Sequence, residues 1–291
     1  MSKTNVNDIL VSVIMPVYNS SAFIKDAIES ILIQTHKKIE FIIIDDGSVD
    51  GSELIIKKYT DDERIVFISR ENKGLVYTLN QALKMANGEY IARMDSDDIS
   101  AANRIEEQLQ FLIKNPDIAV VGCASYIINE RSDIESHRVP PSSPFLNHAL
   151  HFFGPTLTHP SVCFNKKVIG EELYYSDCYP RAEDFELWVR LSRKYSMANI
   201  PKMLFYYRLN SNGISLSNVE EQKKNAALAY YKLKYPNVND EKLLTSLQSI
   251  HSRDFKDKKD VIKSFLYIMT KYEFNKFIFI RFGYFLRWLL K

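Results

Sequence analysis

Apolar runs and amphipathic stretches alternate along the first hundred residues of the chain. The spacing predicts strands at 10–16, 39–44, 65–68 and 90–94 and helices at 22–34, 52–59 and 75–85. The run 39–44 is apolar at almost every position, as in strands that are buried on both faces of a parallel sheet. We therefore expect an α/β fold with a mostly parallel, doubly wound, Rossmann-like sheet flanked by helices.

The rhythm changes after Asp98. The pattern then predicts a helix at 101–114, a strand at 118–122, a long loop around 136–144, a helix beginning near Glu183 and a strand at 203–207. Only helical patterns follow residue 219. We expect two parts, an α/β domain at 1–215 and a helical C-terminal extension at 216–291.

Charge is unevenly divided along the 291 residues, although the formal net charge is only +2. Residues 1–220 hold 23 Lys and Arg against 29 Asp and Glu (net −6), and residues 221–291 hold 15 against 7 (net +8). No nucleic-acid partner is expected. The three cysteines have no C-x-x-C spacing, and neither an export signal nor a long apolar span is present, so a reducing, cytoplasmic location is expected.

Two acidic clusters follow apolar strand-like runs, Asp45-Asp46 after 41–44 and Asp95-Ser96-Asp97-Asp98 after 90–94. Ligands of open α/β sheets bind outside the carboxyl ends of the strands, so both clusters are expected at one mouth. Asp95 and Asp97 are two residues apart and point the same way on extended backbone. Crowded carboxylates favour a divalent cation such as Mg²⁺ or Mn²⁺, whereas the alternative is a pair of solvated loops.

Tyr18 follows the first strand and offers a ring that can stack on a base, and Asp46 offers an acceptor for the imide N–H of uracil or thymine. Tyr18 is equally well explained as a turn residue, and Asp45 is expected to brace its turn. Glu183 and Asp184 begin an amphipathic helix, where they either cap the helix or supply a general base. His159 is a core, turn or site residue.

These segments together closely resemble the inverting family 2 glycosyltransferases of the GT-A fold, specifically bacterial enzymes of O-antigen, capsule or other surface polysaccharide synthesis. The resemblance covers about residues 10–215 and rests on 11–19, 30–35, 42–48 with Asp50, 72–74, 87–91, 95–98 with Arg104, 159–161, 183–184 with 187–188, and 206–208. It implies that residues 1–215 bind a nucleotide-sugar, preferably a UDP-sugar, and transfer one sugar to a glycan or a polyprenyl-diphosphate-linked acceptor.

The resemblance also implies roles for particular residues. The nucleotide site comprises Pro16, Tyr18, Asp46, Asp95 and Ser96, the metal is held by Asp97 and Asp98, Asp184 is the catalytic base, and Glu183, His159, Trp188 and Arg208 line the site or the acceptor. The cofactor is Mn²⁺ or Mg²⁺. A single displacement at the anomeric carbon gives inversion, with the metal neutralising charge on the leaving diphosphate.

The chain departs from the family pattern in several places. Ala102 replaces a common proline, Asn80 lies in a run without the usual arginine, and Asn210 stands where a histidine is frequent after Arg208. The departure at Asn210 weakens the case for a diphosphate contact there. Tyr284 replaces the glutamine of the Q-x-x-R-W motif of processive synthases, so transfer of single sugars is favoured over polymerisation.

Eleven aromatic residues and nine Lys or Arg, against three acids, lie between Phe255 and Lys291. A helix at 275–291 suits the membrane–water interface and predicts a peripheral position at the inner face of the cytoplasmic membrane. The alternative is a helix docked on the catalytic domain or on a second copy in a homodimer. For the whole protein, the alternatives are a sugar-nucleotide nucleotidyltransferase and a non-catalytic nucleotide-sugar-binding module.

Overall fold

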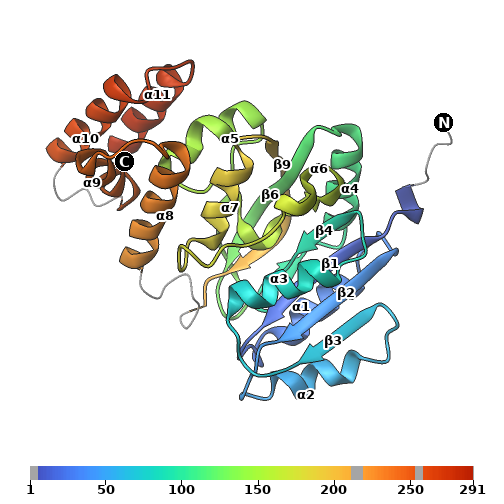
Figure 1. Ribbon diagram of the computed structural model, residues 1–291. Coiled ribbons are helices and arrows are strands. Elements are labelled where there is room, and N and C mark those ends of the chain that lie inside the picture. Colours follow the sequence, from blue (N-terminus) through green and yellow to red (C-terminus); the bar gives the residue numbers. More distant parts are fainter. Residues whose placement is uncertain (1–5, 211–218, 253–257, 291) are drawn as a thin grey trace. The chain divides into compact units, whose positions relative to one another are not determined.

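The computed structural model describes residues 6–210, 219–252 and 258–290. These residues contain a nine-stranded sheet with the order β3-β2-β1-β4-β8-β6-β9-β5, and β7 pairs with β6 (Figure 1). The strands are β1 Val11–Val17, β2 Ile39–Asp45, β3 Ile65–Ser69, β4 Tyr90–Arg93, β5 Ile99–Ser100, β6 Ile118–Ile128, β7 Ile134–Arg138, β8 Cys163–Asn165 and β9 Ser196–Arg208.

The helices follow the predicted amphipathic stretches in the first half of the chain. They are α1 Ile24–Leu32, α2 Ser52–Ile56, α3 Leu75–Met85, α4 Arg104–Lys114, α5 Pro144–Leu150, α6 Lys166–Ile169, α7 Glu183–Leu191, α8 Val219–Lys234, α9 Glu241–Ser252, α10 Lys258–Lys271 and α11 Ile278–Leu289. Short 3-10 helices are η1 Val6–Asp8, η2 Lys57–Tyr59, η3 His151–Phe153, η4 His159–Ser161 and η5 Gly170–Glu172.

Strands β3, β2, β1 and β4 are parallel neighbours, as the βαβ pattern predicts. The other half of the sheet is mixed, because β8 is antiparallel to both β4 and β6 whereas β9 is parallel to β6. The predicted α/β fold with a flanked Rossmann-like sheet is confirmed. The sheet places the carboxyl ends of β1, β2 and β4 next to one another.

Both faces of the central strands are buried. Val13 and Met15 of β1 join a core cluster with residues of α1 and α4, and α3 packs on β1 and β2. Because successive strand residues point to opposite faces, Ile42 and Ile44 of β2 lie on the face away from that cluster, and they are buried as well. Two-sided burial explains why the run 39–44 has almost no polar position.

The chain forms two compact units. The first comprises residues 1–143, 157–175 and 195–213, and the second comprises 144–156, 176–194 and 214–291. Two segments of the predicted 1–215 domain thus belong with the C-terminal helices. The division of the chain into a catalytic part at 1–215 and a C-terminal extension at 216–291 remains a prediction.

Aromatic rings fill the core of the second unit. Phe265 stacks on Phe285 at 3.9 Å between ring centroids, and Phe152 meets Tyr230 edge to face. Arg281 and Glu273 form a buried ion pair of 2.5 Å within this aromatic surrounding. Through the described part of the chain, no helix combines the length and the apolar character needed to cross a bilayer.

The predicted loop at 136–144 is wrong at both ends. Ser136 and Arg138 belong to β7, and Pro144 begins α5. Strand β7 is exposed at all five positions, so it lacks the apolar alternation by which a half-buried strand is recognised. Its pairing with β6 supplies the backbone hydrogen bonds instead.

Candidate active site at the carboxyl edge of the sheet

Three loops meet at the carboxyl ends of β1, β2 and β4. The amide of Asn19 donates to Ser48 Oγ at 2.9 Å, which ties the loop after β1 to the loop after β2. Ser20 Oγ and Ser96 Oγ lie 2.6 Å apart, which ties the loop after β1 to the loop after β4. The structure therefore brings together the segments that the sequence places about fifty residues apart.

Pro16 and Tyr18 occupy the end of the central strand. Pro16 is tolerated there because pairing of β1 with β4 ends at Ile14 and Arg93, so the missing N–H would find no strand partner on that side. Tyr18 is 54% exposed beyond the strand. A ring in that position is available for stacking on a flat ligand.

Asp45 and Asp46 have different surroundings. Asp45 accepts hydrogen bonds from Ser48 Oγ and from Ser69 Oγ, so the prediction that it braces its turn is confirmed. Asp46 is 4% exposed and accepts the backbone amides of Lys73 at 2.8 Å and Gly74 at 2.9 Å. Gly74 precedes α3 and has φ +85°, a backbone conformation that favours glycine.

Arg70 is a site residue that the sequence analysis missed. Its Nη1 is paired with Asp46, its Nη2 donates to Thr78 Oγ1 at 2.7 Å, and its Nε donates to Gln81 at 2.9 Å. Arg70 comes directly after β3, at the same edge of the sheet as Asp46. The sequence does contain a signal for Arg70, because a basic residue directly after the third parallel strand is expected at the same edge of the sheet as the acidic clusters.

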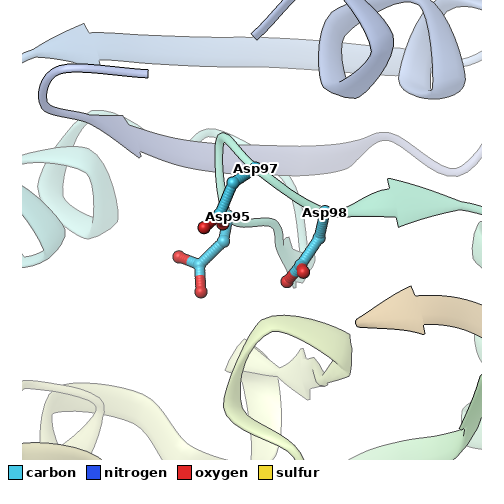
Figure 2. A group of neighbouring side chains, drawn as sticks. All are labelled: Asp95, Asp97 and Asp98. Carbon is cyan, nitrogen blue, oxygen red and sulfur yellow. The ribbon is translucent and has the colours of Figure 1, made fainter. Parts of the chain in front are cut away.

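The acidic loop, residues 94–98 between β4 and β5, carries Asp95, Asp97 and Asp98. One carboxylate oxygen from each of the three lies within 4.8 Å of the other two. Figure 2 shows the three side chains leaving the same loop toward one side. Asp98 is 1% exposed, and its Oδ2 has no hydrogen-bond partner among the described residues.

Burial and mutual repulsion change the protonation of two of these carboxyl groups. Burial and then the charge of Asp95 raise the pKa of Asp97 to about 6. Burial and then the charges of Asp97 and Asp95 raise the pKa of Asp98 well above its ordinary value. Burial and mutual repulsion therefore oppose the simultaneous ionisation of these carboxyl groups, and a cation bound between them would relieve that repulsion.

Arg93 is a second residue that the sequence analysis missed, and it pairs with Asp95. Its side chain is 3% exposed, and its two terminal nitrogens each lie 2.6 Å from an oxygen of Asp95. This bidentate pair fixes the orientation of one carboxylate in the acidic loop. Arg93 lies two residues before Asp95, but its position in a strand does not by itself identify its partner.

Buried polar residues from the family-like segments support the acidic loop. Gln34 Nε2 donates to the carbonyl of Ala101 at 2.7 Å, and its Oε1 accepts the amide of Ile105. Arg104 is completely buried and donates to Ser100 Oγ at 2.7 Å and to the carbonyl of Arg93 at 3.1 Å. Gln34 and Arg104 thus hold the chain on either side of the loop.

His159 lies in η4 of the first unit, where its Nε2 is 2.8 Å from the hydroxyl of Tyr175. Burial, followed by the charge of Arg93, lowers the pKa of His159 well below its ordinary value. The imidazole is consequently neutral at physiological pH. Its role at the site remains a prediction.

Glu183, Asp184 and Trp188 belong to α7 of the second unit. Asp184 Oδ1 accepts the amide of Phe185 at 2.6 Å in the first turn of the helix, and Trp188 is completely buried. A carboxylate in this turn is favoured by the helix dipole. The roles of Glu183 and Trp188 in lining the site and of Asp184 as base stay predictions.

Arg208 is the last residue of β9 and is 3% exposed. Its backbone amide donates to Asp98 Oδ1 at 2.7 Å, and its Nε donates to the carbonyl of Asp97 at 2.6 Å. The structure thus places Arg208 in contact with the acidic loop, 110 residues away in sequence.

Comparison with protein families gives one match over more than half of the chain. The model for "Glycosyl transferase family 2" matches residues 12–171. An uncharacterized glycosyltransferase of Methanocaldococcus jannaschii is 36% identical over 231 residues, which are 77% of this chain and 78% of the relative. An uncharacterized glycosyltransferase of Haemophilus influenzae is 32% identical over 279 residues, covering 89% of this chain and 85% of the relative.

Solved structures agree with the predicted GT-A fold. Staphylococcus aureus TarS residues 1–349 in complex with UDP has a TM-score of 0.60 at 21% identity, covering 83% of this chain and 70% of that chain. A mannosyltransferase from Pyrobaculum calidifontis in complex with GDP-Man and Mn²⁺ has a TM-score of 0.61 at 13% identity, covering 97% and 80%. At these identities the likeness concerns the fold.

Proposed function

The chain belongs to glycosyl transferase family 2, and from this premise we propose that it transfers one sugar, with inversion, from a UDP-sugar to a hydroxyl of a glycan or lipid-linked acceptor. The observation that carries the proposal is the junction of three loops at one edge of the sheet. That junction brings Tyr18, Asp46 and the acidic loop together through the hydrogen bonds of Asn19 and Ser20. A nucleoside diphosphate has a base, which suits Tyr18 and Asp46, and a pyrophosphate, which suits the acidic loop.

The nucleoside end of the site is assigned to Pro16, Tyr18 and Asp46. The Tyr18 ring stacks on the base, and Asp46 accepts its imide N–H. Arg70 pairs with the Asp46 carboxylate and orients it. TarS was solved with UDP and with UDP-GlcNAc, whereas the mannosyltransferase was solved with GDP-Man, so uracil is the base to test first.

The diphosphate end is assigned to the acidic loop with a bound Mn²⁺ or Mg²⁺. The donor set fits such an ion, because three carboxylates offer oxygens within 4.8 Å of one another and Asp98 Oδ2 is buried without a partner among the described residues. Asp97 and Asp98 are the proposed ligands, and Asp95 with Ser96 faces the ribose side. When bound, the ion neutralises charge that develops on the leaving diphosphate.

Asp184 is the proposed general base, which takes the proton from the acceptor hydroxyl as the new C–O bond forms. Glu183, His159 and Trp188 are proposed to shape the acceptor side. The family assignment favours this function over a nucleotidyltransferase or a non-catalytic module.

The decisive experiment compares wild type with Asp184→Asn in a panel of nucleotide sugars with and without Mn²⁺. We expect the variant to bind UDP and Mn²⁺ with unchanged affinity by calorimetry and to lose sugar transfer. Transfer at the wild-type rate would reject Asp184 as base. Glu186→Gln on the same helix is the matched control, because Glu186 is buried and paired with Arg190 rather than available to an acceptor.

We also propose that the second unit binds anionic membrane, where surface-polysaccharide acceptors are located. Apolar side chains are widely exposed on and beside α11, with Phe274 80%, Phe279 86% and Leu290 87% accessible. The exposed basic residues here are Lys258, Lys259, Lys263 and Lys271 of α10, Lys276 between the helices and Arg287 of α11, whereas Asp260 is the one exposed acid of the described α10 and α11. Basic charge beside exposed aromatic rings suits an anionic lipid surface.

Vesicle sedimentation tests this membrane proposal. We expect binding to phosphatidylglycerol vesicles, weak binding to phosphatidylcholine vesicles, and loss of binding in a Phe279→Ser, Leu290→Ser double variant. The proposal would be rejected if the double variant bound these vesicles as well as wild type does, or if wild type formed a dimer through this surface and did not bind vesicles. Leu54→Ser is the control, because Leu54 is an exposed leucine of the first unit, at 66%.

A further inference from the structure

Arg208 joins two loops that are distant in sequence. While Nε donates to the carbonyl of Asp97 at 2.6 Å, Nη1 donates to the carbonyls of Asn129 at 2.8 Å and Glu130 at 3.2 Å. Nη1 also donates to Ser132 Oγ at 3.1 Å. One buried guanidinium therefore bridges the acidic loop and the turn between β6 and β7.

The main chain of Arg208 reinforces this bridge. Its amide donates to Asp98 Oδ1 at 2.7 Å, so the residue holds the backbone at Asp97 and the side chain at Asp98. The next residue continues the connection, because the amide of Leu209 donates to the carbonyl of Ile128 at 2.8 Å. The end of β9 is thus fixed to β6 as well as to the acidic loop.

The partners of the guanidinium are neutral oxygens. Nε and Nη1 of Arg208 donate to carbonyls and one hydroxyl, and the ring of Phe23 lies 4.6 Å from its Cζ. Among the described residues, the Arg208 guanidinium therefore contacts the backbone carbonyl of Asp97 and does not occupy the carboxylate oxygens of Asp97 and Asp98. It can orient the carboxylates and leave Asp98 Oδ2 available.

We propose that Arg208 is a positioning residue that holds Asp97 and Asp98 in the geometry for cation binding, and not a residue that contacts the acceptor. This inference rests on the proposed cation site. A planar guanidinium can donate at once to carbonyls on two loops, whereas a lysine ammonium is a single point with flexible reach. Groups behind metal ligands commonly change metal affinity about 10- to 100-fold when they are lost.

Hydrogen exchange of the cation-free protein is the first test, because it does not depend on metal binding. We expect Arg208→Lys to accelerate exchange of the amides at 95–99 and at 129–133 together by about tenfold, since one side chain protects both loops. Unchanged exchange in either loop would overturn the bridge.

Mn²⁺ affinity measured by calorimetry is the second test. We expect Arg208→Lys to weaken Mn²⁺ binding by about 10-fold or more without change in the affinity for free UDP. If wild type binds Mn²⁺ and the variant binds it equally, the positioning role is wrong while the proposed function stands. If wild type fails to bind Mn²⁺, the cation dependence in the proposed function is wrong and the exchange test still decides the bridge.

Two further variants separate positioning from folding. Ser132→Ala removes one Nη1 partner in an exposed turn and is expected to weaken Mn²⁺ binding by about twofold with a normal melting temperature. Arg64→Lys is the matched control. Arg64 lies next to the amino end of β3, where it pairs with the carboxylate of Asp62 and its Nη1 donates to the carbonyl of Leu32 at 3.1 Å. Weaker Mn²⁺ binding in Arg64→Lys equal to that of Arg208→Lys would overturn the inference.

Discussion

Asp46 and the acidic loop both follow parallel strands of one sheet, yet the protein surrounds them in opposite ways. Arg70 and the amides of Lys73 and Gly74 satisfy Asp46. In the acidic loop, burial and neighbouring carboxylates raise the pKa of Asp97 to about 6. The same sequence signal therefore marks a carboxylate that the protein pairs with its own donors and a group of carboxylates that repel one another, where we propose the cation.

The largest effect is expected for Asp97→Asn. Because a bound cation supplies several kcal/mol of stabilisation to the leaving diphosphate, loss of a ligand should lower kcat/KM by about 1000-fold. Steady-state kinetics with saturating Mn²⁺ and calorimetry of Mn²⁺ binding measure the two consequences. If this variant binds Mn²⁺ as tightly as wild type, Asp97 is not a ligand of the cation, and the proposed difference between Asp46 and the acidic loop is wrong.

Asp46→Ala is expected to lower the free energy of unfolding by about 3 kcal/mol. The substitution leaves the largely buried guanidinium of Arg70 and two backbone amides without their acceptor. Urea unfolding followed by circular dichroism measures the change. Asp61→Ala, an exposed site in the turn before β3, is the control and should change stability by less than about 0.5 kcal/mol.

Asp97→Asn is expected to do the reverse to the cation-free protein and stabilise it by about 1 kcal/mol above pH 7. The folded state holds the Asp97 proton up to about pH 6, whereas an unfolded aspartate loses it near pH 4. Stability of the cation-free wild type therefore falls as pH rises between these values, and above them the full cost of the charge is present.

Melting temperatures measured from pH 4 to 8, with and without Mn²⁺, check this pH dependence. Mn²⁺ binds the ionised carboxylates, so its stabilising effect on wild type should grow between pH 5 and pH 7. Asp97→Asn should flatten both curves. A wild-type response to Mn²⁺ that is equal at pH 5 and pH 7 contradicts the assignment.

The smallest effect is expected at Tyr18. Tyr18→Ala should weaken UDP binding about fivefold, because a stacked ring contributes about 1 kcal/mol, and Tyr18→Phe should keep the affinity. The melting temperature of both variants should match that of wild type, because the side chain is 54% exposed. An unchanged affinity in Tyr18→Ala would assign Tyr18 to the turn alone.

The sequence by itself determined the parallel half of the sheet, the positions of the two acidic clusters and the family. Each depends on short-range patterns, because strands buried on both faces are continuous apolar runs and carboxylates after them are visible in one dimension. Strand β8 has three residues, and β7 is exposed throughout. Such strands exist because a neighbour pairs with them, which no local pattern records.

The tertiary structure alone decided how each carboxylate is surrounded. Asp46 meets Arg70 across 24 residues, and Asp98 meets Arg208 across 110. Residues 144–156 and 176–194 form one compact unit with the C-terminal helices, although both segments are distant from these helices in sequence. Hydrogen bonds and ion pairs depend on distance in space, and the charge of a side chain in the sequence does not state which partner the folded chain will bring to it.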